Sequence, residues 1–377
     1  MRVAIITLPL HTNYGGILQA YALKRSIESL GHSAEVIDRK CKMTLPPLWK
    51  RPLIYMKRAA QNLRPPGGGP EIFRERRIIK ELPVVSAELQ GFIQGDMSPR
   101  VVDDYSDIGL GEYDAFVVGS DQVWRPKYFG KIEDAFLGFA ARWNVRRVAY
   151  AASFGVDQLE YTYQQLEECS ALLGRFDAVS VRESSAVTVC DEWFGREEVA
   201  HVLDPVLLLS AEHYAALAQR SARRPCRGRI LSYILDGDRS KYFVLQRVEG
   251  WLGISSHEAY IPDRDRRLPL EQRIVPDICQ WLSCFADAEF VVTDSFHGCV
   301  LSVLFHKPFI ALCNIGRGMS RIQSFLETLG LDDRIVHGID PDDDGEYYLS
   351  GIDWERVDAR LEEMKGSSMD FLRNALK

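Results

Sequence analysis

The chain has 377 residues, of which 46% are hydrophobic and 26% charged; this is more than one hydrophobic core usually holds and predicts two domains. The formal net charge of −7 argues against general nucleic-acid binding, and no apolar run approaches the roughly 20 residues of a membrane-spanning helix. The eight cysteines include no CxxC pair and follow no secretory signal, so we expect reduced thiols in a cytoplasmic protein.

Short β-rich runs alternate with segments of helical periodicity, a pattern typical of βαβ units and parallel sheets. In the first half we expect a helix at 16–30 and strands at 3–8, 34–37, 115–118, 147–151, 178–181 and 199–203. Pro205 then interrupts the regular pattern. In the second half we expect helices at 277–285 and 298–305 and strands at 230–234, 254–261, 290–292 and 309–312.

This order of elements predicts an α/β protein with two Rossmann-like domains, each built on a mainly parallel sheet. We place the first domain at 1–205 and the second at 206–350. Ligands of such domains bind past the carboxyl ends of the strands, so we expect a cleft between the domains where those ends converge. The remaining segment, 351–377, has a helical composition.

The segment 39–70 departs from this alternation. It holds eight basic residues and no acidic one, interleaved with apolar and aromatic residues such as Trp49 and Tyr55. An anionic membrane surface attracts this composition, at about 1 kcal/mol per basic residue. Three interpretations stay open: a peripheral contact with the inner face of a membrane, a site for a partner or acceptor, and a solvated loop.

Polar residues follow several of the expected strands, at the sheet edge where ligands bind. After the first strand, Asn13 and Tyr14 precede the pair Gly15 and Gly16 at the start of a helix. Paired glycines leave backbone N–H groups open to an anion or a sugar hydroxyl. Asn13 is also suited to cap the helix, which is the structural alternative. We take these four residues as candidates for acceptor binding.

Two further strands deliver polar or charged residues to the same edge. In GSDQVW, Ser120 and Asp121 follow the strand and Trp124 lies close behind, which indicates either function or structural reuse of a similar turn. In VSVRE, Arg182 follows the strand and precedes a helix. A guanidinium there binds carboxylate or phosphate through two parallel hydrogen bonds, unless a nearby acid pairs with it instead.

The stretch VVTDSFHG contains the strongest candidates for catalytic residues. Asp294 and Ser295 end a strand, and His297 and Gly298 begin a helix whose N-terminus favours an anion. A lone histidine after a strand is more often a hydrogen-bonded structural residue. A histidine near a carboxylate and an anion site is the arrangement that general acid catalysis requires.

Five stretches, in this order and at these separations, resemble the polysaccharide pyruvyl transferase family: NYGGILQAYAL, DAFVVGSDQVW, VSVRE, LDPVLLL and VVTDSFHG. The resemblance covers roughly 2–330 and implies a two-domain fold of the GT-B type, in which a C-terminal helix often crosses back to the first domain. It also implies transfer of the pyruvyl group of phosphoenolpyruvate to two hydroxyls of a sugar, with release of phosphate. The acceptor would be a cell-surface polysaccharide, such as a capsule, or its lipid-linked precursor.

The resemblance also implies roles for single residues. Arg182 matches the family's arginine that grips the donor, and His297 matches the histidine of its T-D-x-x-H-G motif. His297 would protonate the methylene carbon of phosphoenolpyruvate, and either Asp121 or Asp294 would accept a hydroxyl proton. No metal is obligatory, and phosphoenolpyruvate would be a co-substrate without a further cofactor.

The chain departs from the family at one point. Better-known members carry Arg-Leu between the Asp and the His of the motif, where this chain has Ser295 and Phe296. Another cation must then complete the donor site beside Ser295 and Gly298. The candidates are Arg317 and Arg321, at the start of the next helix, and Lys307. Two alternatives to a pyruvyl transferase stay open: a GT-B glycosyltransferase that uses a nucleotide sugar, and a non-catalytic glycan-assembly protein.

Overall fold

The computed structural model describes residues 1–40, 45–62, 71–156, 158, 160–259, 268–313, 319–340 and 342–377. The strands of this part of the chain form two separate sheets, and the pairings within both sheets are parallel. The predicted α/β class with two parallel sheets is therefore confirmed.

The first sheet has seven strands in the spatial order β3 (Arg100–Val102), β2 (Ser33–Arg39), β1 (Arg2–Ile6), β4 (Ala115–Val118), β5 (Arg146–Ala152), β6 (Ala178–Val181) and β7 (Ala200–His201). Its helices are α1 (Tyr14–Ser29), α2 (Arg51–Asn62), α3 (Arg74–Val85), α4 (Ala87–Phe92), α5 (Pro126–Phe129), α6 (Tyr163–Leu173) and α7 (Ser185–Phe194). The strand order reverses between β1 and β4, which is the point where doubly wound sheets bind ligands.

The second sheet has five strands in the order β12 (Ile335–Val336), β11 (Phe309–Leu312), β10 (Phe290–Thr293), β8 (Ile230–Tyr233) and β9 (Ser256–Glu258). Its helices are α8 (Ala211–Gln219), α9 (Arg239–Leu252), α10 (Ile278–Asp287), α11 (Phe296–Leu304), α12 (Met319–Leu329) and α13 (Glu346–Leu349), and the chain ends in α14 (Trp354–Ala375). This order reverses between β8 and β10.

Most expected elements lie where hydrophobic periodicity placed them. Strands β4 and β6 coincide with the predictions, and α10 and α11 begin within two residues of theirs. Strands β3 and β12 were not predicted, because strands of two or three residues at a sheet edge are too short to show an alternation. Part of the strand expected at 254–261 lies outside the described residues, and the described part forms β9.

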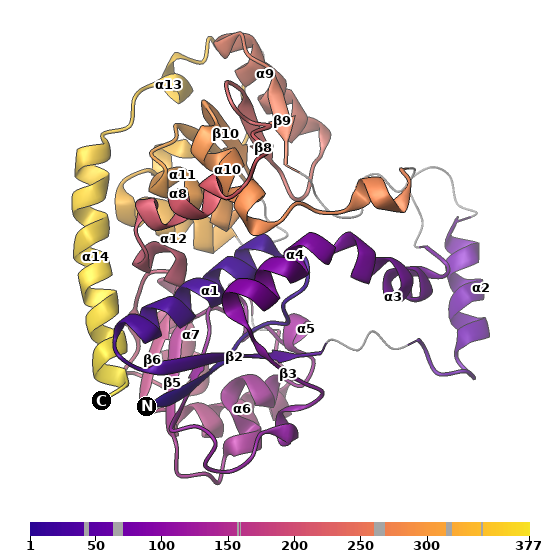
Figure 1. Ribbon diagram of the computed structural model, residues 1–377, viewed down its shortest axis with the longest axis vertical. Helices are drawn as coiled ribbons and strands as arrows, with labels where there is room; N and C mark the ends of the chain where they lie inside the picture. The colour runs from indigo at the N-terminus through magenta and orange to yellow at the C-terminus, as the bar shows by residue number, and fades with distance from the viewer. Residues whose placement is uncertain are drawn as a thin grey trace.

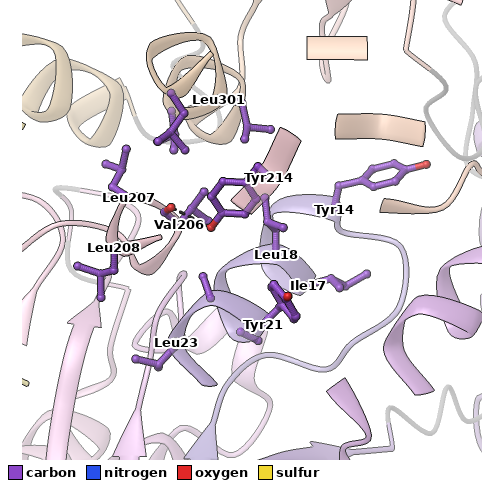
Figure 2. Close-up of a cluster of buried hydrophobic side chains, with 14 of the residues drawn as sticks. Tyr14, Ile17, Leu18, Tyr21, Leu23, Val206, Leu207, Leu208, Tyr214 and Leu301 are labelled. Carbon is purple, nitrogen blue, oxygen red and sulfur yellow. Dashed lines mark hydrogen bonds between the residues drawn. The ribbon is translucent and has the colours of Figure 1, made fainter. Parts of the chain in front are cut away.

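Helix α1 lies between the two sheets and is buried on nearly all sides. Its Ile17, Leu18 and Tyr21 meet residues of the 3-10 turn Pro205–Leu208, as Figure 2 shows, and Tyr214 of α8 belongs to the same core. At its first residue, the Tyr14 hydroxyl donates to the Pro276 carbonyl at 2.7 Å. The apolar core is therefore continuous from one domain to the other, which fixes how the strand ends face each other.

Helix α14 runs along both domains (Figure 1). Near its start the Trp354 ring stacks on His306, with ring centroids 4.8 Å apart. Near its end, the Arg146 guanidinium of the first sheet donates to the Ala375 carbonyl at 3.0 Å. The helix thus links the second domain to the first.

Helices α2 and α3 extend away from the body of the protein (Figure 1). Helix α2 has no buried residue. No helix in the described part of the chain combines the length and the apolarity needed to cross a membrane.

Candidate active site

Loops from both sheets meet at the junction of the two domains. Asn13 follows β1, Asp121 follows β4 and Arg182 follows β6, while His297 lies in the first turn of α11, directly after β10. Because the strands of each sheet are parallel, these residues lie at the carboxyl ends, next to both points of strand-order reversal. The structure therefore brings together predicted site residues from both halves of the sequence.

Arg182 is the centre of a buried charge network. One of its Nη atoms donates to Asp204 Oδ2 at 2.8 Å, and the other donates to Asp121 Oδ1 at 3.3 Å. The guanidinium carbon lies 4.6 Å from the centre of the Phe296 ring, and only 1% of the side chain is exposed. Burial alone would lower the arginine pKa, but the two carboxylates raise it. The cation is thus held in one orientation.

Asp204 is a site residue that the sequence analysis did not identify. Its side chain is fully buried, and Oδ2 accepts from Arg182 and, at 3.3 Å, from the Ser120 hydroxyl. The same oxygen lies 3.7 Å from His297 Nε2. The LDPVLLL stretch offered a signal, since an acid placed directly before Pro205 and just after the last strand of a sheet is at the ligand-binding edge.

His297 is buried against the start of α1. A Cβ atom added to Gly15 would lie 2.0 Å from His297 Nδ1, so glycine is required for the two helix N-termini to approach this closely. His297 Nε2 is buried and has no hydrogen-bond partner among the described residues. Burial lowers the pKa of His297 by more than Asp204 raises it, so the imidazole is neutral at neutral pH.

Asp121 completes the charge network. Its Oδ2 accepts from the Asn13 side-chain amide at 3.2 Å, and its Oδ1 lies 3.9 Å from Arg321 Nη1. Burial would raise the pKa of this carboxyl, but Arg182, His297 and Arg321 together lower it. Asp121 is therefore ionised at neutral pH. Binding of an anion would offset the positive charge around Asp121, which would raise the pKa of this carboxylate and let it accept a proton.

Arg321 supplies a second cation from the other domain. It lies in the first turn of α12 and is buried, and burial together with repulsion from Arg182 lowers its pKa to about 10. The Ser184 amide donates to Ser324 Oγ at 3.1 Å, which holds this helix against the start of α7. The other predicted cation, Arg317, lies outside the described residues.

Asp294 points away from this network, although it is adjacent to Ser295 in sequence. Its Oδ1 accepts from the Leu235 amide at 2.6 Å, and its Oδ2 accepts from the Lys241 ammonium at 2.7 Å. Both oxygens thus hold the loop after β8. Ser295 itself is the N-cap residue of α11 and is buried. We therefore do not propose Asp294 as the base.

Several predicted residues have packing roles. Trp124 is fully buried and its ring stacks on Phe136, with ring centroids 5.1 Å apart, and Tyr14 is buried between the domains. A Cβ at Gly298 would lie 2.1 Å from Thr293 Oγ1, so that glycine serves the strand-to-helix turn. The amide of buried Ser120 donates to Gln19 at 2.8 Å. Trp124 and Tyr14 therefore have packing roles, and neither is given a part in the chemistry proposed below.

The assembled group contains two guanidinium ions, two carboxylates and a neutral imidazole at the N-termini of two helices. Asp121 lies near both guanidinium ions, and Arg321 adds a second positive charge to the group from the other domain. The arrangement can bind a small anion and move a proton at His297.

The sequence was compared with known proteins. Residues 13–314 match the profile of a family described as polysaccharide pyruvyl transferase, which covers more than half of the chain. No curated protein matches the chain.

Three solved structures illustrate the structural likeness. UDP-GlcNAc 2-epimerase from Neisseria meningitidis, bound to UDP-GlcNAc, has a TM-score of 0.47 and 11% identity, and the match covers 100% of this chain and 99% of that chain. The corresponding epimerase from Methanocaldococcus jannaschii has a TM-score of 0.45 and 12% identity, covering 96% of this chain and 92% of that chain. The glycotransferase of kitacinnamycin has a TM-score of 0.45 and 12% identity, covering 100% and 99%.

Proposed function

The chain belongs to the polysaccharide pyruvyl transferase family, and on that premise we propose that it transfers the pyruvyl group of phosphoenolpyruvate to two hydroxyls of a sugar and forms a cyclic ketal. One feature of the site supports the proposal most strongly. A buried histidine nitrogen without a hydrogen-bond partner among the described residues lies beside a fixed arginine–carboxylate network, at the meeting point of both domains.

The donor carries a carboxylate and a phosphate, so its binding requires positive charge. In the proposed complex Arg321 and the N-termini of α1 and α11 face the donor, while Arg182 remains anchored by its two carboxylates. Arg321 thereby takes the place of the guanidinium that better-known relatives carry at the position of Ser295. Binding of the anion raises the pKa of His297 and favours its imidazolium form.

The first chemical step adds one sugar hydroxyl across the carbon–carbon double bond of the donor. The hydroxyl oxygen bonds to the central carbon and its proton passes to Asp121, while His297 Nε2 gives a proton to the methylene carbon, which becomes a methyl group. Asp204 orients Arg182 and lies beside the histidine that gains positive charge on donor binding.

The second step closes the ketal. The carbon–oxygen bond to phosphate breaks and its electron pair leaves with the phosphate. The second sugar hydroxyl then bonds to the same carbon, and its proton leaves with phosphate or solvent. His297 regains a proton from Asp121 through solvent, so the enzyme returns to its initial state with one cyclic ketal and one phosphate formed.

The proposal is tested by giving the purified protein phosphoenolpyruvate together with lipid-linked oligosaccharides. We expect phosphate release and an acceptor mass gain of one pyruvyl ketal, with one deuterium in the product methyl group when the reaction runs in D₂O. His297→Gln and Arg321→Gln should abolish transfer. His306→Gln is the matched control, because that histidine is exposed and packs on Trp354.

Other outcomes contradict the proposal. A hexose-sized mass gain from a nucleotide sugar would instead identify a glycosyltransferase. Turnover that survives in His297→Gln would remove the histidine from the mechanism. A folded protein that binds phosphoenolpyruvate but transfers nothing to any oligosaccharide with a suitable diol would favour a non-catalytic glycan-assembly protein.

We further propose that α2 brings the enzyme to a membrane that carries the lipid-linked acceptor. One face of α2 is tied to the neighbouring segment, because Arg58 pairs with Glu75 at 2.6 Å. On the helix surface Leu53 and Met56 are 69% and 62% exposed. Exposed apolar side chains beside the basic residues of this segment fit an anionic bilayer surface.

This second proposal is tested with vesicles that contain anionic phospholipid. Leu53→Asp should lower the bound fraction, and Leu110→Asp is the matched control because Leu110 is 73% exposed in a turn of the first domain. Binding should weaken with salt. Equal binding of both variants and the parent protein would exclude α2 as the membrane contact, without affecting the proposed chemistry.

A further inference from the structure

A second cluster of reactive side chains lies in the second domain. Cys226, His257 and Cys284 each offer one ligand atom, and these atoms all lie within 4.8 Å of one another. They come from three separate elements: the loop before β8, strand β9 and helix α10. Sequence spacing gives no sign of the group, because its members are separated by about thirty residues each way.

The register between β8 and β9 explains why the three side chains face one another. His257 is the register partner of Leu231, and Leu231 belongs to the same buried core as Cys226 and Cys284. Register partners in a sheet point to the same face, so the imidazole is directed toward α10. The two sulfurs are buried and the imidazole is half-buried, which leaves solvent access from the side of His257.

We propose that Cys226, His257 and Cys284 bind a zinc ion. Two thiolates and an imidazole are the donor set that zinc prefers, and tetrahedral coordination with bonds of about 2.0 to 2.3 Å separates the donor atoms by roughly 3.5 to 3.8 Å. Side-chain movements of about 1 Å therefore suffice to bring the three ligand atoms to these separations. The fourth position is taken by solvent. Two thiolates neutralise the ion, so the buried site carries no net charge.

The neighbouring charges fit such a site. Asp287 lies three residues after Cys284 on α10 and pairs with Arg224, with 3.1 Å between Nη1 and Oδ2. The negative charge of that carboxylate is thus balanced by Arg224 next to the proposed site. Cys226 is fixed by its own backbone, because its carbonyl accepts from the Arg229 amide at 3.0 Å.

The zinc site is distinct from the proposed active site. Cys226 precedes β8 and Cys284 lies near the end of α10, which is the edge of the second sheet where its strands begin. His297 follows β10, at the edge where the strands end. The ion would tie β9, a three-residue strand at the edge of the sheet, to α10. The ion would therefore stabilise this edge of the sheet, and its site is separate from the pyruvyl transfer chemistry.

The test measures metal content of the full-length protein, produced with zinc in the medium and purified without chelators. We expect about one zinc ion per chain, and loss of it in Cys226→Ser and His257→Asn, because removal of a ligand weakens binding by at least roughly 100-fold. Cys279→Ser is the matched control: Cys279 is buried on the same helix but outside the cluster, and this variant should keep its zinc.

Two further measurements keep the result independent of variant stability. Cobalt added to the metal-free protein should give a thiolate charge-transfer absorption and the visible bands of a tetrahedral ion. A chelator should lower the melting temperature of the parent protein but leave that of His257→Asn unchanged. Absence of metal in the parent protein after incubation with zinc would overturn the proposal. So would a Cys226–Cys284 disulfide in the freshly purified protein, or zinc content that is the same in all variants.

Discussion

Replacement of Gly15 by alanine should displace His297, although the change adds only one methyl group. The added Cβ would lie 2.0 Å from Nδ1, whereas ordinary van der Waals contacts are about 3.5 to 4.0 Å, so the imidazole must move by roughly 1.5 Å. A displacement of about 1 Å at a catalytic group costs on the order of 100-fold in rate. Overpacking costs about 1 to 3 kcal/mol, and the better helix propensity of alanine returns up to about 1 kcal/mol.

The measurements are pyruvyl transfer by mass spectrometry and the free energy of unfolding by urea denaturation. Gly366→Ala is the matched control, because Gly366 is an exposed helical glycine whose added Cβ meets nothing within 4 Å. That variant should be as active as the parent protein and slightly more stable. The double variant Gly15→Ala with His297→Ala should regain the stability lost to the clash. Parent-level transfer by Gly15→Ala would refute the assigned contact and, with it, the position of the acid.

Three more predictions concern charge. Arg182→Met should lower the free energy of unfolding by about 3 to 5 kcal/mol, because it leaves buried Asp204 without its cation; a second change, Asp204→Asn, should restore part of this loss. The free energy of unfolding should fall as the pH drops below 6.5, the histidine pKa in the unfolded chain, because the unfolded chain takes up a proton that buried His297 does not. The fall should not exceed about 1.4 kcal/mol per pH unit, and it should be smaller in His297→Gln. Asp294→Asn should destabilise the protein through the loss of its ion pair with Lys241, while the Kd for phosphoenolpyruvate, measured by calorimetry, should stay unchanged. A large loss of affinity would show that Asp294 takes part in donor binding.

Most of the secondary structure could be predicted from local patterns. Short apolar runs bounded by polar residues mark where strands such as β4 begin and end, whereas α11 is buried on all sides and follows its strand as a second apolar run without a polar face. The rule that ligands bind past the carboxyl ends of parallel strands then placed Asp121, Arg182 and His297 at a common edge.

The contacts within the site could not be predicted in this way. Asp204 and Asp294 both follow strands, yet one joins Arg182 and the other turns to Lys241. Trp124 follows the same strand end, three residues after Asp121, yet its ring lies in the core. Which way a side chain turns after a strand depends on neighbours from distant segments, and no local period records those neighbours.

The sequence by itself determined the order and type of the elements, the family, and the set of polar residues carried to the strand ends. The tertiary structure alone decided that α1 of the first domain and α11 of the second meet, with Gly15 against His297, and that Cys226 and His257 converge on Cys284. The physical reason is range: periodicity reflects burial of a single element, whereas a site depends on the close packing of several elements whose separation in the chain is arbitrary.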